Sequence, residues 1–312
     1  MTLPRAAWLD LMGREYFSGF IQAGGGAVRF VVADPDALRA VADGLRGLAE
    51  AHGMATIAVD TANVKLHMLQ QLFFALANAI DWESLIQTRL EALVADAGYR
   101  WPQPGKRMAL LAVAEANEVA PNLLQRQVSQ QITRAVWLDT AMAQDFRNAM
   151  MALLLARLAD DRDALRDAVQ DWLRGQLRRI ALVRAAQIGG KISRHNARAM
   201  LKSLFHWLRT CGLPGVAVQI DISRLLRERR DVEQGLVYAP AAVMDCYEVL
   251  RQMIDDSAAM EGLFLAVLAD PPLLSDNPRR SLGQYTALKM RLLEDIRPAE
   301  GDNPLAPLVV LR

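Results

Sequence analysis

The N-terminal part of the chain alternates between short apolar runs and a longer amphipathic segment. The runs VRFVV (28–32) and ATIAVD (55–60) are rich in β-branched residues, which favours short strands buried on both faces. The segment between them carries Pro35 and Asp36 in its first turn, and both residue types are favourable at the start of a helix. The pattern therefore predicts a strand, a turn, a helix and a second strand.

The middle of the chain has a different pattern. From about 62 to 212 the sequence is rich in Ala, Leu, Arg and Gln, and its apolar residues recur at helical spacing. Breaks that contain proline or glycine fall at 99–107, 120–122 and 188–191. We therefore predict a large helical insertion over 62–212.

Strand character returns near residue 213. The runs GVAVQID (215–221) and GLFLAVLAD (262–270) lie on either side of a helix expected at about 240–258. A helix at about 281–293 and a last apolar run, PLVVL (307–311), follow. Because strands alternate with helices, we predict an α/β domain with a mostly parallel sheet in three layers.

The expected organisation has four parts. The first is an N-terminal helix over 5–22 with a glycine-rich bend, together 1–26. The first half of the α/β core (27–61), the helical insertion (62–212) and the second half of the core with the C-terminal segment (213–312) follow.

Composition narrows the class of protein only modestly. A hydrophobic fraction of 52% with 23% charged residues is typical of a globular domain with a large core. The net charge of +1 gives no argument for whole-protein attraction to nucleic acid or membranes. Cys211 and Cys246 are too few for a disulfide framework, and no run reaches the ~20 apolar residues of a membrane span. We expect a cytoplasmic protein without a membrane partner.

The turn after the first strand raises the question of phosphate binding. In P-loop ATPases this turn has the pattern G-x-x-x-x-G-K-[ST], and a later strand ends on an aspartate that orients magnesium. Here the later strand VAVQID does end on Asp221, which alone is a weak signal. The turn, however, consists of Ala33, Asp34, Pro35 and Asp36, and it contains neither glycine nor lysine.

Six longer stretches combine these elements and cover most of the chain. They are REYFSGFIQAGGGAVRFVV, AVDTANVKLHMLQQLFFALANAID, ISRHNARAMLKSLFHWLRTCGLPGVAVQID, VLRQMIDDSAAMEGLFLAVLADPPLL, NPRRSLGQYTALKMRLLEDIRP and NPLAPLVVLR. In these stretches the chain resembles the P-loop ATP-binding proteins of BREX-type bacterial anti-phage systems, which have an AAA+-like core. The resemblance implies a P-loop NTPase-like fold, with the Walker B strand ending at Asp221.

Two positions depart from the family pattern. The loop Ala33–Asp36 lacks the glycines that turn backbone amides inward and the lysine that balances the phosphates, and its two carboxylates would repel a triphosphate. After Asp221, the family pattern has an acidic residue that positions the attacking water, whereas this chain has Ile222. We therefore expect a degenerate phosphate loop, a vestigial Walker B position, no catalytic residue, no bound metal and no cofactor.

Two groups of arginines are candidate contacts. The segment SRLLRERRD predicts either a solvated helix face or a surface for an acidic partner or nucleic acid phosphates, through Arg224, Arg227, Arg229 and Arg230. The resemblance suggests a second group, because AAA+-like proteins keep arginines in the later part of the chain that reach a neighbour's nucleotide. These candidates are Arg279, Arg280 and Arg291.

The sequence favours a catalytically degenerate ATPase-like subunit that acts as a scaffold or regulator in an anti-phage defence complex. Its expected partner is an active ATPase of the same fold, with nucleic acid as a further partner through the complex. One alternative is an active or nucleotide-responsive ATP-binding switch with an atypical phosphate loop, which would bind ATP and Mg²⁺. Another is a DNA-binding adaptor that uses the arginines after Asp221.

Overall fold

The structure is a computed structural model that describes residues 3–159, 163–228, 233–277, 279–293 and 303–312. It divides the chain into two compact units. The first contains Met1–Leu76 and Leu213–Arg312, and the second contains Ala77–Gly212. The helical insertion was expected to begin at 62, whereas 62–76 belong to the first unit.

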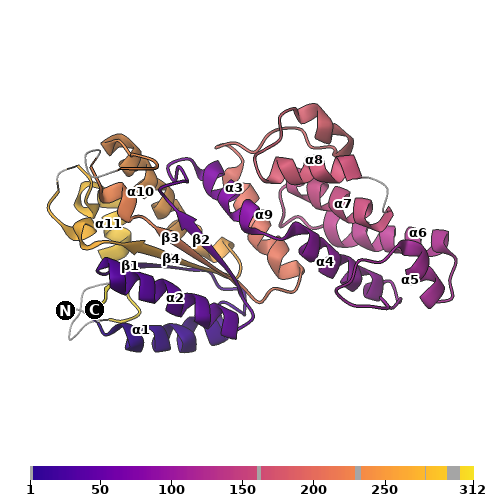
Figure 1. Cartoon of the computed structure of the whole chain (residues 1–312), viewed down its shortest axis with the longest axis horizontal. Coiled ribbons are helices and arrows are strands. Elements are labelled where there is room, and N and C mark those ends of the chain that lie inside the picture. The colour runs from indigo at the N-terminus through magenta and orange to yellow at the C-terminus, as the bar shows by residue number, and fades with distance from the viewer. Residues whose placement is uncertain (1–2, 160–162, 229–232, 278, 294–302) are drawn as a thin grey trace. The chain divides into compact units, whose positions relative to one another are not determined.

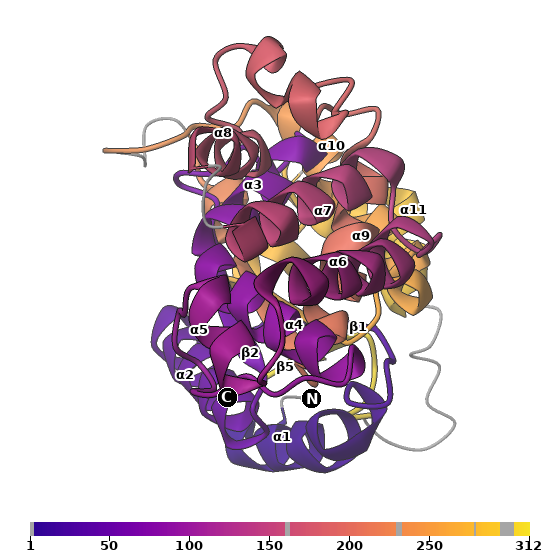
Figure 2. The ribbon, with the colours of Figure 1, turned by 90° about the vertical axis from the view of Figure 1, so that its right-hand side faces the viewer.

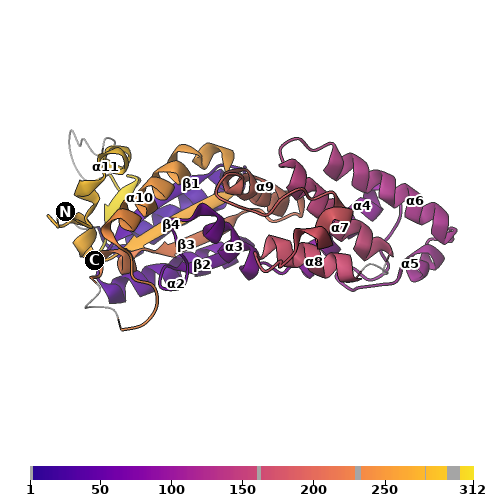
Figure 3. The same cartoon turned by 90° about the horizontal axis from the view of Figure 1, so that it is seen from above.

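The first unit is built on a sheet of five parallel strands. The strands are β1 (Ala27–Val32), β2 (Ala55–Asp60), β3 (Val216–Asp221), β4 (Leu263–Ala269) and β5 (Leu308–Val310). The first four confirm predicted strands, β5 lies in the last apolar run, and every neighbouring pair is parallel. The order β2-β3-β4-β1-β5 places β1 between two strands that come late in the sequence (Figure 3).

Helices cover both faces of this sheet. On one face lie α1 (Arg5–Met12), the π-helix η1 (Gly13–Phe20) and α2 (Pro35–Ala51), and on the other lies α10 (Pro240–Asp255) with α11 (Thr286–Leu293) packed against it (Figure 1). The predicted helix over 5–22 is thus a helix continued by a π-helix. The three expected layers are present.

Helix α2 shows why the first face closes. Its buried residues Leu38, Val41, Leu45 and Ala49 recur every three or four positions, so they form one stripe. The stripe packs into a core cluster with Val31, Ala217, Phe264 and Leu268 of the sheet. The apolar face of α2 therefore holds the start of the helix beside the carboxyl ends of the strands.

The glycine-rich bend before β1 is tightly packed. Gly24 has φ +99°, a conformation that residues with a side chain rarely adopt. At Gly26 an added Cβ would lie 1.9 Å from the carbonyl oxygen of Ser257. The bend therefore needs glycine for close packing.

The second unit is helical, as predicted. Its helices include α4 (Trp82–Asp96), α5 (Leu110–Ala116), α6 (Pro121–Ile132), α7 (Gln144–Ala159), α8 (Asp163–Leu173) and α9 (Ala197–Thr210), and α3 (Leu69–Ala79) crosses the boundary (Figure 2). Helix α7 is central, because it contacts α4, α6 and α8. Over the described ranges, no helix combines the length and apolar character needed to cross a bilayer.

Candidate functional site

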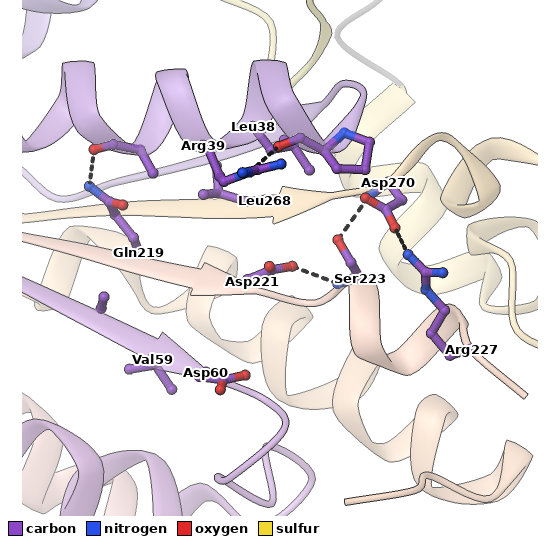
Figure 4. A pocket seen from close by; sticks show the side chains of 13 residues that line it. Leu38, Arg39, Val59, Asp60, Gln219, Asp221, Ser223, Arg227, Leu268 and Asp270 are labelled. Atoms are coloured by element: carbon purple, nitrogen blue, oxygen red, sulfur yellow. Dashed lines mark hydrogen bonds and ion pairs between the residues drawn. The ribbon is translucent and has the colours of Figure 1, made fainter. Parts of the chain in front are cut away.

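A cavity of about 420 Å³ lies where three strands of the sheet end beside α2 (Figure 4). Because the strands are parallel, their carboxyl ends meet at one edge, which is where ligands bind in open α/β sheets. The volume falls within the range of small-molecule sites. The residues that line the cavity are Pro35, Leu38, Arg39, Ala42, Ala58, Val59, Asp60, Gln219, Asp221, Ser223, Arg227, Leu268 and Asp270.

Asp60 and Asp221 come from paired positions at the ends of β2 and β3. Asp60 accepts hydrogen bonds from the Ala62 amide (2.7 Å) and from Asn63 Nδ2 (2.9 Å), one on each oxygen. Asp221 Oδ1 accepts the amide of Ser223 at 2.8 Å. Both carboxylates thus cap the turn that follows their own strand, although both stay exposed to the cavity.

The third carboxylate of the cavity, Asp270, directly follows β4 and forms an ion pair. Its Oδ2 accepts a hydrogen bond from Arg227 Nη2 at 2.8 Å, and its side chain is only 9% exposed. Its amide donates to Ser223 Oγ at 3.1 Å. The ion pair neutralises the acid at the cavity wall. The described residues contain no cluster of three or more side chains that could hold a metal ion.

Gln219 forms the polar floor of the cavity. Its side chain is almost buried in β3, and Nε2 donates to the carbonyl oxygen of Ala42 in α2 at 2.9 Å. A buried amide needs such a partner, because an unpaired one costs about 1–3 kcal/mol. The bond therefore fixes α2 over the strand that ends in Asp221.

The connection between β1 and α2 is short and offers few free backbone amides. Only Ala33 and Asp34 connect β1 to α2, whereas the P-loop motif is about eight residues long. The Ala33 amide donates to the Ala269 carbonyl (3.3 Å), and the Asp34 carbonyl accepts the Leu38 amide at 2.8 Å. Pro35 has no amide hydrogen to offer.

The start of α2 adds no positive charge to this connection. Asp36 pairs with Arg39, so the cationic side chain nearest in sequence is already bound to a carboxylate. The cavity lining contains no lysine. The residues present therefore do not fit a triphosphate at this position.

The position after Asp221 also lacks the second acid. Ile222 is fully buried, and its amide donates to the Leu268 carbonyl at 2.8 Å, so it continues the pairing of β3 with β4. Thr61 Oγ1 donates to the Asp221 carbonyl at 2.7 Å and ties the ends of β2 and β3 together. Asp221 thus lies in the cavity without an acidic neighbour in the next position.

The arginines after Asp221 do not form a continuous helix face in the described residues. Ser223–Leu226 is a single 3-10 turn, and Arg227 is already extended. Arg224 Nε donates to the Leu236 carbonyl at 2.9 Å, whereas Arg227 pairs with Asp270 in the cavity. Arg229 and Arg230 lie outside the described residues. The prediction that Arg224 and Arg227 share one helix face is therefore wrong, because the two residues lie outside a continuous helix and bind separate partners.

The three later arginines occupy different environments. Arg280 is 7% exposed and donates to the carbonyls of Leu225 and Tyr238, both at 2.9 Å, so it cannot reach a neighbouring subunit. Arg291 is half-exposed and pairs with Asp255 at 2.9 Å. Arg279 is exposed. A trans-acting role thus stays a prediction for Arg279 and Arg291 only.

Sequence reasoning missed several cavity residues. Asp60 and Asp270 each end or follow an apolar run, as Asp221 does, so the same signal could have found them. Arg39, Gln219 and Ser223 carry no such signal, because their places in the cavity depend on how α2 lies on the sheet. Of the predicted site residues, the structure brings Pro35, Asp221 and Arg227 together.

The two cysteines take no part in this site. Both side chains are buried, and burial raises the pKa of Cys211 to about 12 and that of Cys246 to about 12. The thiolate is the reactive form of cysteine, and the raised pKa keeps both thiols protonated at neutral pH. Neither residue is a candidate nucleophile.

The parallel sheet, its covering helices and the cavity at the carboxyl edge define an α/β protein of the P-loop NTPase-like class. A family model described as BREX system ATP-binding protein BrxC/D matches residues 49–312. The chain therefore belongs to this family, among the components of BREX anti-phage systems. The match begins within α2, after the loop Ala33–Asp36. No curated protein and no solved structure matches the chain.

Proposed function

We propose that the protein is a non-hydrolysing, ATPase-like subunit of a BREX complex and acts there as a scaffold or regulator. The observation that supports this proposal is the connection between β1 and α2. Two residues, Ala33 and Asp34, cannot form the nest of inward-pointing amides that holds phosphates. Ile222, buried after Asp221, supports the same conclusion for the hydrolytic step.

The sheet and the helices that cover it support a scaffold role. The sheet and its covering helices are present although only two residues connect β1 to α2. A fold that has lost its catalytic groups is useful through the surfaces it presents, and the multi-subunit nature of the BREX system provides partners for them. The proposed partner is an active ATPase of the same fold.

The direct test is calorimetric titration of the full chain with ATP and Mg²⁺, beside the Asp221→Ala variant. We expect no binding heat for either protein, because triphosphate contacts are missing. Binding that disappears in the variant would contradict the proposal and make Asp221 a site residue. Binding that survives the substitution would also contradict it and place the nucleotide elsewhere.

The scaffold role is tested by co-elution with the partner ATPase and by the hydrolysis rate of that enzyme. Purified chain mixed with the intact ATPase of the same BREX system is expected to co-elute with it in size-exclusion chromatography. The mixture is expected to differ from the ATPase alone in hydrolysis rate. Separate elution with an unchanged rate would refute a role as scaffold or regulator of that enzyme.

A second candidate function is a nucleotide-responsive switch with an atypical loop. The cavity of about 420 Å³, which contains Asp221, favours it. The calorimetric comparison separates the two candidates, since only the switch predicts heat that depends on Asp221. Arg227, half-exposed and paired with Asp270, gives less support to a DNA-binding adaptor built on residues 224–230.

A further inference from the structure

The helical unit contains a long segment of a single charge sign. Residues 172–220 include no aspartate and no glutamate. The same segment carries nine positive side chains: Arg174, Arg178, Arg179, Arg184, Lys191, Arg194, Arg198, Lys202 and Arg209. The net charge of +1 for the whole chain conceals this local excess.

Five of these side chains form an exposed group between α8 and α9, which we call the basic surface. It consists of Arg178, Arg179, Arg184, Lys191 and Arg194, and all five are exposed. Across the ranges that the structure describes, none of the five forms an ion pair with a carboxylate. By contrast, the exposed Arg14 and Arg46 of the sheet unit pair with Asp10 and Asp43.

Contacts hold the two ends of the basic surface together. Lys191 Nζ lies 3.4 Å from the carbonyl oxygen of Arg178, although the residues are 13 positions apart. Trp172 Nε1 donates to the Gly190 carbonyl at 2.8 Å and anchors the second loop to the end of α8. The 3-10 helix Ile180–Ala186, which contains Arg184, follows directly from Arg178 and Arg179. Lys191 therefore lies beside Arg178, and Arg179, Arg184 and Arg194 follow within a few positions of these two along the chain.

We propose that the basic surface binds the phosphate backbone of a nucleic acid. Unpaired positive side chains gain most from phosphates, because each contact releases condensed counterions. The cores of protein–protein interfaces are depleted of charged residues as a whole, although arginine is enriched in such interfaces, whereas nucleic acid interfaces are strongly positive. The composition of the surface thus favours nucleic acid over an acidic protein.

A groove beside the basic surface offers a place for a base. A cavity of about 320 Å³ is lined by Trp137, Ala185 and Gln187 among others, and the Trp137 side chain is 38% exposed. The Arg147 guanidinium lies 5.9 Å from the centre of the Trp137 ring. Aromatic rings beside basic residues are typical stacking platforms for single-stranded nucleic acids.

The test is fluorescence anisotropy of a labelled DNA duplex, and of one of its strands, titrated with the full chain at several salt concentrations. If three to five phosphates are contacted, affinity for the duplex should fall roughly 40- to 500-fold between 50 and 200 mM salt. The double variant Arg178→Glu with Lys191→Glu should abolish duplex binding at 200 mM salt. Affinity independent of salt, or unchanged in the variant, would overturn the proposal.

The matched control is the double variant Arg14→Glu with Arg46→Glu, which changes the net charge by the same amount. Since both arginines are already paired with carboxylates, DNA affinity should change less than about threefold. Equal losses in the two double variants would show that only total charge matters and would refute a specific surface. Circular dichroism confirms that each variant is folded.

Two further measurements distinguish a nucleic acid partner from an acidic protein. Trp137→Ala is expected to weaken single-strand binding about 5- to 150-fold and to leave the salt dependence unchanged. Poly-glutamate added as competitor should displace DNA only at much higher charge concentration. Equal displacement would overturn the proposal in favour of an acidic protein partner. The experiment contains no ATP, so its failure leaves the proposed ATPase-like role untouched.

Discussion

At the scale of single residues, Arg280 shows how the sequence can suggest one role and the structure another. Its guanidinium is buried and bridges the carbonyls of Leu225 and Tyr238, and its own carbonyl accepts the hydroxyl of Tyr247 at 2.5 Å. Hydrogen bonds from a buried charged group contribute more than neutral ones. Arg280 thus joins its own segment to residues that lie 33 to 55 positions earlier in the sequence.

We predict that Arg280→Ala lowers the free energy of unfolding by about 2–4 kcal/mol, because two buried carbonyls lose their charged donor. Urea unfolding followed by circular dichroism measures the change. The neighbouring, exposed Arg279 is the control, and Arg279→Ala should alter stability by less than about 0.5 kcal/mol. Similar effects of the two substitutions would contradict a bridging role for Arg280.

At the scale of elements, α10 and α11 are joined by a network of charges. Arg251 donates to Glu248 at 2.7 Å and also pairs with Asp255, which in turn accepts Arg291 of α11 at 2.9 Å. The hydrogen bonds from Arg251 hold the pKa of Glu248 at about 2 against the opposing effect of burial, and the Tyr285 hydroxyl, which donates to the same carboxylate, lowers the pKa by a smaller amount. The network thus favours the ionised form of Glu248.

The depressed pKa predicts a loss of stability in acid. Because the native state binds a proton at Glu248 less readily than the unfolded state, the contribution is complete above pH 4.5 and disappears as the pH falls toward 2. Between pH 7 and pH 3, the urea midpoint of wild type should therefore fall more than that of Glu248→Gln. Glu50→Gln, at the exposed end of α2, is the control, and a wild-type-like fall in Glu248→Gln would refute the prediction.

Also at the scale of elements, the strands were predictable whereas their order was not. Each strand is a short apolar run bounded by turn residues, so β2 was expected at 55–60 and is found there. Nothing in those runs states that β1 pairs with β4 and β5. Several strands have similar apolar surfaces, so the runs themselves do not specify which strands become neighbours. The neighbours are determined by packing between segments that are distant in sequence.

At the scale of the whole molecule, the proposed pairing with an active ATPase gives a role to the exposed arginines. An arginine that reaches a partner's nucleotide stabilises charge in the transition state, and such residues contribute up to 10³–10⁵ in kcat. Arg279 and Arg291 are the two candidates whose side chains are exposed.

We predict that Arg279→Ala or Arg291→Ala lowers kcat of the partner ATPase at least tenfold in the assembled complex, with little change in co-elution. The steady-state rate of phosphate release measures the effect. Arg14→Ala, which removes a paired surface arginine, is the matched control. An unchanged kcat in both variants would exclude trans action by these residues, while the scaffold role would stand.

The sequence by itself determined the α/β class, four of the five strands, the helical middle of the chain and the absence of glycine and lysine from the turn after the first strand. These features depend on local periodicity and residue type, which a single chain displays directly. Only the tertiary structure decided that Asp60, Asp221 and Asp270 share one cavity, and that Arg280 is buried. It also decided that the basic surface lacks carboxylate partners among the described residues. Each of these properties depends on residues that are distant in sequence, because strand order and helix packing determine which of those residues become neighbours.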